Sequence, residues 1–148
     1  MIEFTMDKEA IIKLWSEVFG DSVEEITFFI DNVKNAKCLM LFDKGKAASM
    51  MYLVDCKITD KSYSYIYAAC TLPEYRDRGF MTELIDFCFQ QGLDVCLIPA
   101  SDSLIDYYAK RGISHKTAID SIIFEQIPEI KEYLFEGYNL TVPTALRS

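Results

Sequence analysis

Two periods alternate in the hydrophobic pattern of the chain, and each predicts one kind of element. Apolar residues three and four positions apart are typical of a helix that buries one face, whereas aromatic and small apolar runs are typical of buried strands. The runs predict strands over Ile2–Thr5 and over residues 37–43, 47–57, 63–70, 95–99, 118–125 and 138–142. The helical spacing predicts helices between Asp7 and Gly20, from Ser22 onward, between Gly79 and Gly92, from the capping residues 100–103 to Gly112, and over Pro128–Phe135.

The order of these elements indicates a mixed α/β fold. Residues 37–43 and 47–57 are joined by the Lys44-Gly45 turn, which predicts an antiparallel pair. Residues 95–99 follow a strand and a helix, which predicts that they lie parallel to residues 63–70. With 148 residues, 51% of them hydrophobic, the chain can bury one core, and we expect a single domain over residues 1–148.

The charge balance bears on what the protein can bind. Fifteen basic and 23 acidic residues give a net charge of −8 at pH 7, which argues against a nucleic-acid partner and favours neutral or cationic ones. No apolar run approaches the roughly 20 residues that span a bilayer, and the first residues lack the basic and apolar segments of a signal peptide. We therefore expect a cytoplasmic protein with no membrane partner, either a monomer or a homodimer.

The five cysteines are scattered and fall mostly within apolar runs, without Cys-x-x-Cys spacing. We interpret them as buried thiols. No group of His, Cys, Asp or Glu residues has the spacing of a metal site, so no metal is expected.

Residues 71–82 join the strand over 63–70 to the next helix through a turn suited to a pyrophosphate. The helix begins near Gly79, where the first N–H groups have no intrahelical partners and attract an anion. Arg76 and Arg78 add positive charge, and Thr82 offers a hydroxyl donor. A strand-turn-helix with two surface arginines is the simpler alternative.

This segment, Thr71-Leu72-Pro73-Glu74-Tyr75-Arg76-Asp77-Arg78-Gly79-Phe80-Met81-Thr82, resembles the acetyl-coenzyme A signature of the GCN5-related N-acetyltransferase (GNAT) superfamily. The core of that signature reads Arg/Gln-x-x-Gly-x-Gly/Ala and often follows Pro-Glu-Tyr, and Met81 stands where a small residue is usual. The resemblance implies the acyl-CoA N-acyltransferase fold, in which a mostly antiparallel central sheet has flanking helices and a splayed parallel pair formed by the fourth and fifth strands. It also implies a set of residues that bind acetyl-CoA, with Ser101 where many relatives have an asparagine: Cys70, Thr71, Leu72, Arg76, Asp77, Arg78, Gly79, Phe80, Met81, Thr82 and Ser101.

A second segment, Tyr108-Ala109-Lys110-Arg111-Gly112-Ile113, resembles the family's Tyr-x-Lys-x-Gly-Phe motif. The tyrosine of that motif protonates the leaving thiolate, so the resemblance implies that Tyr108 is the catalytic residue. A core residue with a satisfied hydroxyl is the alternative for Tyr108. Tyr107 points roughly 100° away around the helix and is not expected to take the same role.

No catalytic base is assigned by the sequence. The strand over 63–70 carries no Asp or Glu, and the remaining candidates are Asp55, His115 and the C-terminal carboxylate of Ser148. Asp55 and His115 are more simply explained as solvated surface groups. Without a Ser-His-Asp order, or a histidine placed to activate Cys70, direct attack of the amine on the thioester is favoured over an acyl-cysteine.

The sequence thus predicts an enzyme that transfers an acetyl group from acetyl-CoA to a primary amine of a small molecule or peptide through a ternary complex. The alternative is a non-catalytic acyl-CoA-binding regulatory module or a fragment of a larger acetyltransferase.

Overall fold

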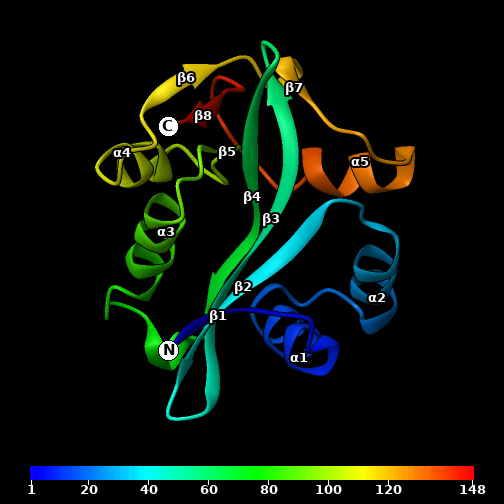
Figure 1. Ribbon diagram of the computed structural model, residues 1–148, viewed down its shortest axis with the longest axis vertical. Helices are drawn as coiled ribbons and strands as arrows, with labels where there is room; N and C mark the ends of the chain where they lie inside the picture. Colours follow the sequence, from blue (N-terminus) through cyan, green and yellow to red (C-terminus); the bar gives the residue numbers. More distant parts are fainter.

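The centre of the protein is one twisted sheet of eight strands (Figure 1). The computed structural model describes residues 1–148. The strand order is β1-β2-β3-β4-β5-β8-β6, with β7 paired to β3, and every pair is antiparallel except β4 with β5. The strands are β1 (Ile2–Thr5), β2 (Ala36–Asp43), β3 (Lys46–Ile58), β4 (Lys61–Thr71), β5 (Val95–Leu97), β6 (His115–Thr117), β7 (Ile122–Ile123) and β8 (Ala145–Arg147).

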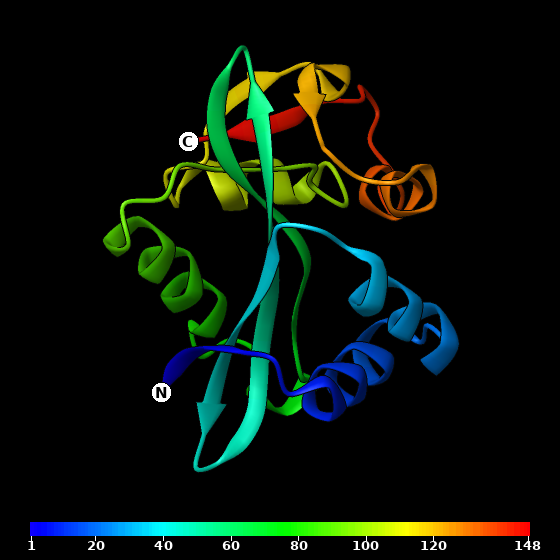
Figure 2. The ribbon, with the colours of Figure 1, turned by 45° about the vertical axis from the view of Figure 1, so that its right-hand side comes forward.

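Helices cover both faces of the sheet. Helices α1, α2 and α5 lie on one side and α3 and α4 on the other, as both ribbon views show (Figures 1 and 2). The helices are α1 (Lys8–Phe19), α2 (Val23–Asn32), α3 (Phe80–Gln90), α4 (Ser103–Ala109) and α5 (Pro128–Phe135). None of them is both long enough and apolar enough to cross a membrane.

Each face of the sheet has its own core. On β3, Met50, Tyr52 and Val54 belong to the cluster under α1, α2 and α5. Met51 and Leu53, which alternate with them, belong to the cluster under α3. Successive residues of the strand point to opposite faces, and both faces are buried. The apolar run over residues 47–57 is therefore continuous instead of alternating with polar residues.

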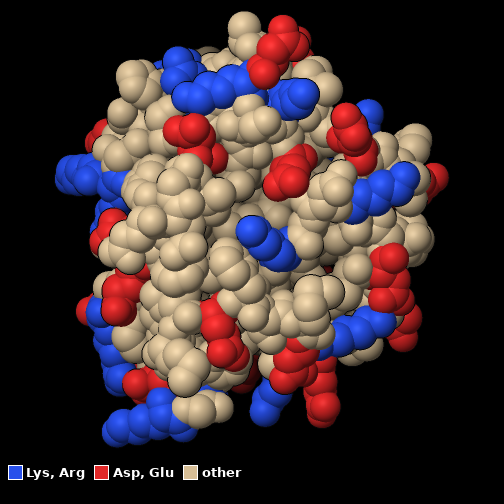
Figure 3. Space-filling model, viewed as in Figure 1, with Lys and Arg blue, Asp and Glu red and all other residues tan.

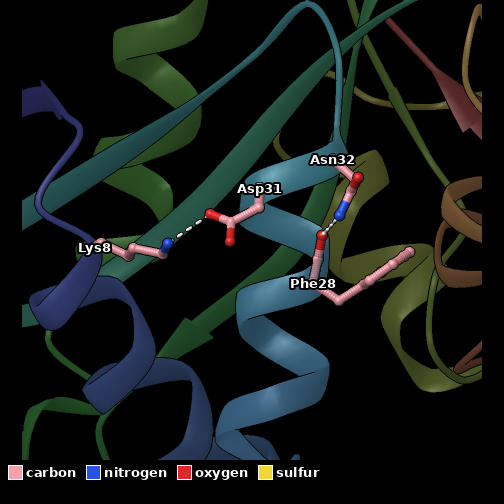
Figure 4. A network of polar contacts seen from close by, with 4 residues as sticks. All are labelled: Lys8, Phe28, Asp31 and Asn32. Carbon is pink, nitrogen blue, oxygen red and sulfur yellow. Dashed lines mark hydrogen bonds and ion pairs between the residues drawn. The ribbon is translucent and has the colours of Figure 1, made fainter.

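The first two helices begin where the capping residues predict. Asp7 accepts from the Ala10 N–H at 3.1 Å, and Ser22 and Glu25 form a complete capping box. An ion pair also joins the two helices: the Lys8 ammonium at the start of α1 contacts the Asp31 carboxylate near the end of α2 (Figure 4). The ion pair therefore joins the two helices at the ends that lie away from their connecting residues 20–22.

The parallel strands β4 and β5 diverge after a short pairing. Only Ser64 with Val95 and Tyr65 with Cys96 are in register, so one edge of β4 is left without a strand partner from residue 66 onward. The fold class predicted from the sequence is confirmed: the sheet is mostly antiparallel, with one splayed parallel pair and flanking helices.

Two strand predictions were wrong. Residues 118–125 do not form one strand, because the short helical turn Ile119–Ser121 interrupts them and the Ser121 hydroxyl donates to the Ala118 carbonyl over 2.6 Å. Only Ile122–Ile123 then pairs with β3.

The second wrong prediction concerns residues 138–142, which form a loop. The N–H of Thr141 donates to the Asp102 carboxylate at 3.0 Å, so a side chain replaces the strand partner there. Asn139 keeps a single bridge to Ser101. Pro143 has no N–H to donate, and the last strand begins only at Ala145.

Candidate active site

The turn after β4 leaves the start of α3 open to an anion. Asp77 and Gly79 both have positive φ, 63° and 78°, and the second ends the turn directly before Phe80. No side chain caps α3, and its first backbone bond joins the Glu83 N–H to the Gly79 carbonyl. The N–H groups of residues 80–82 consequently have no acceptor within the protein.

Two arginines lie at this helix start, as predicted. The Arg76 Nε donates to the Thr71 carbonyl at 3.1 Å, which leaves the terminal nitrogens of the guanidinium exposed. The Arg78 guanidinium lies 5.1 Å from the centre of the Tyr75 ring. The Phe80 ring also stacks on the Tyr75 ring, with 5.8 Å between the ring centres. The side chains of Phe80 and Met81 pack against the core under α3, which accounts for a bulky residue at position 81.

A third cation comes from the end of α4 and was missed by the sequence analysis. The Arg111 Nε donates to the Thr82 hydroxyl at 2.8 Å, and its Nη1 donates to the Tyr107 carbonyl at 2.7 Å. Since a hydroxyl both accepts and donates, Thr82 still has its own proton for a ligand. Arg111 lies in the segment that begins with Tyr108, but the family motif assigns no role to its position, so the sequence analysis did not single it out.

The strand end offers fewer free backbone groups than the resemblance implies. The Leu72 N–H donates to the Ala48 carbonyl at 2.9 Å, and the Cys70 carbonyl accepts from the Ser49 hydroxyl at 3.0 Å. Alternate residues of a strand direct their backbone groups to opposite edges, so Thr71 faces the open edge. Ser101, the other position implied by the family, bonds to the Ser103 hydroxyl at 3.0 Å.

A β-bulge lies on β4 next to the open edge. Met50 pairs with Cys70 and Tyr52 with Tyr67, so the two residues Ala68 and Ala69 oppose a single residue of β3. Ala68 has a φ of 52°, which is uncommon for a residue with a Cβ. The pair of small residues in an aromatic strand is the sequence signal that would have located this bulge.

The open edge of β4 borders a cavity of about 570 Å³. The bulge forms one side of it, together with residues of β5 and α4, and α1, α2 and α5 supply the opposite side. Its lining is mostly hydrophobic: Trp15, Phe19, Asp21, Glu25, Ile26, Tyr65, Ile66, Tyr67, Ala68, Ala69, Leu97, Ile98, Ala100, Leu104, Tyr108, Glu132, Tyr133, Glu136 and Gly137. The cavity therefore passes from one face of the sheet to the other along the edge of β4.

Tyr108 lines this cavity, whereas Tyr107 does not. The Tyr107 ring lies 3.5 Å from the Arg111 guanidinium, and its plane is nearly perpendicular to that of Tyr108 at 87°. Burial raises the pKa of the Tyr108 hydroxyl to about 12, with Tyr107 adding to the shift and Arg111 opposing it. Tyr108 therefore keeps its proton at neutral pH and can donate it.

The base candidates from the sequence lie elsewhere. Asp55 borders a different pocket, with Lys57, Ser62 and Asp94. His115 is exposed on β6, and the Ser148 N–H donates to the Val95 carbonyl at 2.9 Å beside β5. The carboxylates that do line the cavity come from α2 and the loop before it and from the end of α5, and the sequence analysis proposed none of them as a base: Asp21, Glu25, Glu132 and Glu136.

All five cysteines are buried and free, as the sequence predicted. Burial raises the pKa of the Cys70 thiol to about 12, so this residue is a neutral thiol at pH 7. No group of three or more His, Cys, Asp or Glu side chains is arranged to hold a metal ion.

The family is decided by the sequence comparison. Residues 5–115 match the model of the "Acetyltransferase (GNAT) domain" family. The chain belongs to the GNAT acetyltransferases. No curated protein matches this GNAT domain in sequence.

Solved structures share the GNAT fold at low identity. An acyl-CoA N-acyltransferase from Pseudomonas aeruginosa has a TM-score of 0.60 at 19% identity, over 83% of this chain and 97% of that one. A GNAT family N-acetyltransferase from Escherichia coli in complex with CoA has a TM-score of 0.58 at 16% identity, over 76% and 67%.

The glucosamine N-acetyltransferase region of a fungal multi-domain GH3 β-N-acetylglucosaminidase has a TM-score of 0.64 at 15% identity, over 79% of this chain. The chain spans 17% of that fungal protein and 31% of a probable N-acyltransferase from Enterococcus faecalis. At these identities the likeness establishes the GNAT fold alone.

Proposed function

We propose that the protein is an N-acetyltransferase that moves an acetyl group from acetyl-CoA to a primary amine by direct attack. The observation that carries the proposal is the convergence on one cavity of the β4 bulge and the Tyr108 hydroxyl. The open start of α3 is joined to the strand that carries the bulge by the turn over residues 72–79.

Acetyl-CoA fits the groups at the start of α3. Its pyrophosphate would be held by the three unpartnered N–H groups of residues 80–82, by the exposed nitrogens of Arg76 and by the Thr82 hydroxyl. Arg78 and Arg111 add positive charge at the same end of the helix. This local charge offsets the net charge of −8, which otherwise opposes a polyanionic substrate.

The thioester would lie along the open edge of β4. The bulge at Ala68 and Ala69 frees backbone from the ladder with β3, and small side chains there let the carbonyl approach. Cys70 does not attack the thioester, because its buried thiol is not ionised at neutral pH. The nucleophile is therefore the acceptor amine itself.

Tyr108 acts as the acid in this proposal. The nitrogen lone pair of the neutral acceptor attacks the carbonyl carbon, the nitrogen releases one proton to water, the carbon–sulfur bond breaks, and the sulfur takes the proton of the Tyr108 hydroxyl. Solvent then returns a proton to the phenolate. A thiol with a pKa of about 8.5 leaves more readily when it is protonated as the bond breaks.

The acceptor must lose a proton before it attacks. For an amine of pKa about 10.4, reaching the neutral form at pH 7 costs about 4.6 kcal/mol. We propose that water in the cavity takes this proton and passes it to a carboxylate at the rim. Asp21 suits this task, since its Oδ2 accepts from the Trp15 Nε1 at 2.8 Å and its other oxygen stays free.

Two measurements test the function. Calorimetry should show acetyl-CoA binding to the purified protein, and CoA release should follow when a panel of amines is added. Release should be followed by chromatography, because the protein carries five thiols of its own. The absence of binding at millimolar acetyl-CoA would refute the proposal, and binding without turnover of any amine would favour the non-catalytic module instead.

A further inference from the structure

The charged residues that line the cavity are exposed side chains of one sign, and we call them its rim. Four of its 19 lining residues are carboxylates and none is Lys, Arg or His, although the face of the molecule seen in Figure 3 mixes basic and acidic side chains. The four are Asp21, Glu25, Glu132 and Glu136.

None of these carboxylates is neutralised by the protein. The three ion pairs of the chain join Lys8 to Asp31, Lys46 to Glu74 and Lys61 to Asp94, all outside the cavity lining. Within the cavity group, one oxygen of Asp21 accepts from Trp15 and one oxygen of Glu25 accepts from Ser22. The side chains of Glu132 and Glu136 form no hydrogen bond at all within the protein.

The interior of the cavity has polar groups that lack partners. The hydroxyls of Tyr67 and Tyr108 both line it, and neither forms a hydrogen bond within the protein. Burial raises the pKa of Tyr67 above its ordinary value, and Asp21, Tyr133 and Glu136 add to that shift. Tyr67 therefore keeps its proton at neutral pH, so its hydroxyl can both donate and accept a hydrogen bond.

Aromatic rings complete a surface that suits an alkylammonium group. The Trp15 ring lies 5.8 Å from that of Tyr67, and Tyr133 stands on the α5 side of the same cavity. The faces of such rings attract cations, and the rings also offer apolar surface on which methylene chains can pack. A volume of about 570 Å³ is in the range of sites for small molecules.

We propose that the acceptor is a small polyamine, a molecule with its reacting primary amine beside Tyr108 and at least one further ammonium group at the rim formed by Asp21, Glu25, Glu132 and Glu136. The proposal rests on the acetyltransferase function above. The division of charge follows from the reaction, since the amine near the bulge must lose its proton whereas the distant ammonium keeps its own.

The test compares two acceptors that share a four-carbon chain. 1,4-Diaminobutane and butylamine differ by one amine. The ratio of their kcat/KM values therefore measures how strongly the rim favours the second ammonium group, and effects on the reacting amine cancel. One exposed ion pair changes an equilibrium by up to about fivefold, so removing two rim charges in Glu132→Gln/Glu136→Gln should lower the preference for the diamine about tenfold. These two positions are chosen because their side chains support nothing else in the fold.

A matched control removes the same charge elsewhere. Glu24→Gln/Glu129→Gln changes two exposed carboxylates on α2 and α5 that do not line the cavity, and it should leave the ratio unchanged. Equal kcat/KM values for the two amines in the unaltered protein, or an unchanged ratio in the rim variant, would overturn the polyamine proposal while the acetyltransferase function stands.

Direct binding separates the two proposals further. Calorimetric titration of spermidine into the protein at low salt should show binding that weakens about tenfold in the rim variant and falls with added salt. If no amine is acetylated and acetyl-CoA does not bind, the proposed function fails. The spermidine titration still shows whether the rim carboxylates bind a polyamine. Absence of spermidine binding to the unaltered protein would overturn the inference.

Discussion

The Arg111 Nε donates to the hydroxyl of Thr82 over 2.8 Å, and this bond ties the end of α4 to the first turn of α3. The same guanidinium donates from Nη1 to the Tyr107 carbonyl and lies 3.5 Å from the Tyr107 ring. Arginine has five N–H donors in a fixed fork, so these bonds leave others for a ligand. The helix of the proposed catalytic tyrosine is thereby joined to the proposed pyrophosphate site.

Replacing Arg111 should weaken acetyl-CoA binding more than it slows the reaction. Arg111→Ala removes a cation held beside the open start of α3, and a charge-assisted hydrogen bond of about 1.4 kcal/mol corresponds to a tenfold rise in KM for acetyl-CoA. Lys110→Ala removes the same charge from the exposed neighbouring position and should leave KM within twofold. Steady-state kinetics measure both, and equal effects of the two variants would show that Arg111 acts only through net charge.

Tyr108→Phe should lower kcat by about 10²- to 10⁴-fold, the range for loss of a general acid, with little change in acetyl-CoA affinity. Tyr107→Phe is the control, since it keeps the ring that stacks on Arg111 and should retain full activity. Because the pKa of Tyr108 is about 12, this residue stays protonated over the working range. The rate should then rise with pH as the acceptor amine loses its proton, and a decline below pH 10 would contradict the role of Tyr108.

Alkaline pH should unfold the protein through its buried thiols and phenols. Burial raises the pKa of Cys70 from its ordinary value of 9.0 to about 12 and that of Cys88 to about 11, so these thiols hold their protons more tightly when folded. The stabilisation is therefore complete below pH 9 and is lost as pH rises from 9 through 11 to 12. Urea unfolding between pH 7.5 and 10.5 measures this fall, which should be shallower in Cys70→Ala; a stability that rises over this range would contradict it.

The elements that the sequence predicts correctly are fixed by local chemistry. Asp7 and the pair Ser22 and Glu25 cap their helices with side chains only three residues away, and the apolar run over 47–57 reports a strand that is buried on both faces. The wrong strands at 118–125 and 138–142 have apolar residues of strand type, but hydroxyl and carboxylate side chains take the backbone groups that a ladder needs. The bond between Thr141 and Asp102 joins residues 39 positions apart, so no local pattern predicts it.

The candidate site also contains one part that the sequence predicts and one part that it does not. The turn before α3 is contiguous in sequence, and its glycine and arginines predict the open helix start that the structure has. The acidic rim draws its residues from α2 and its preceding loop and from α5, more than 100 positions apart, so no local pattern announces it. Arg111 likewise reaches Thr82 only because α4 packs beside α3.

The bulge on β4 gives a prediction with opposite signs at adjacent residues. Ala68 has a φ of 52°, a conformation that costs an L-residue with a Cβ roughly 1 to 2 kcal/mol but costs glycine nothing. Ala68→Gly should therefore leave the free energy of unfolding unchanged or raise it slightly. Ala69→Gly, one position along at negative φ, should lower it by about 0.5 to 1 kcal/mol, because glycine there only gains freedom in the unfolded chain.

A β-branched residue at the same position should harm both stability and activity. Ala68→Val places a stiff side chain in the left-handed region, which should lower the free energy of unfolding by about 1 to 2 kcal/mol beyond that of Ala68→Gly. It also fills space at the edge of the cavity where the thioester is proposed to lie, so kcat/KM should fall even at temperatures where the variant is fully folded. Urea denaturation and initial rates of the three variants measure these effects, and equal destabilisation by glycine at positions 68 and 69 would show that the strand does not carry a left-handed bulge.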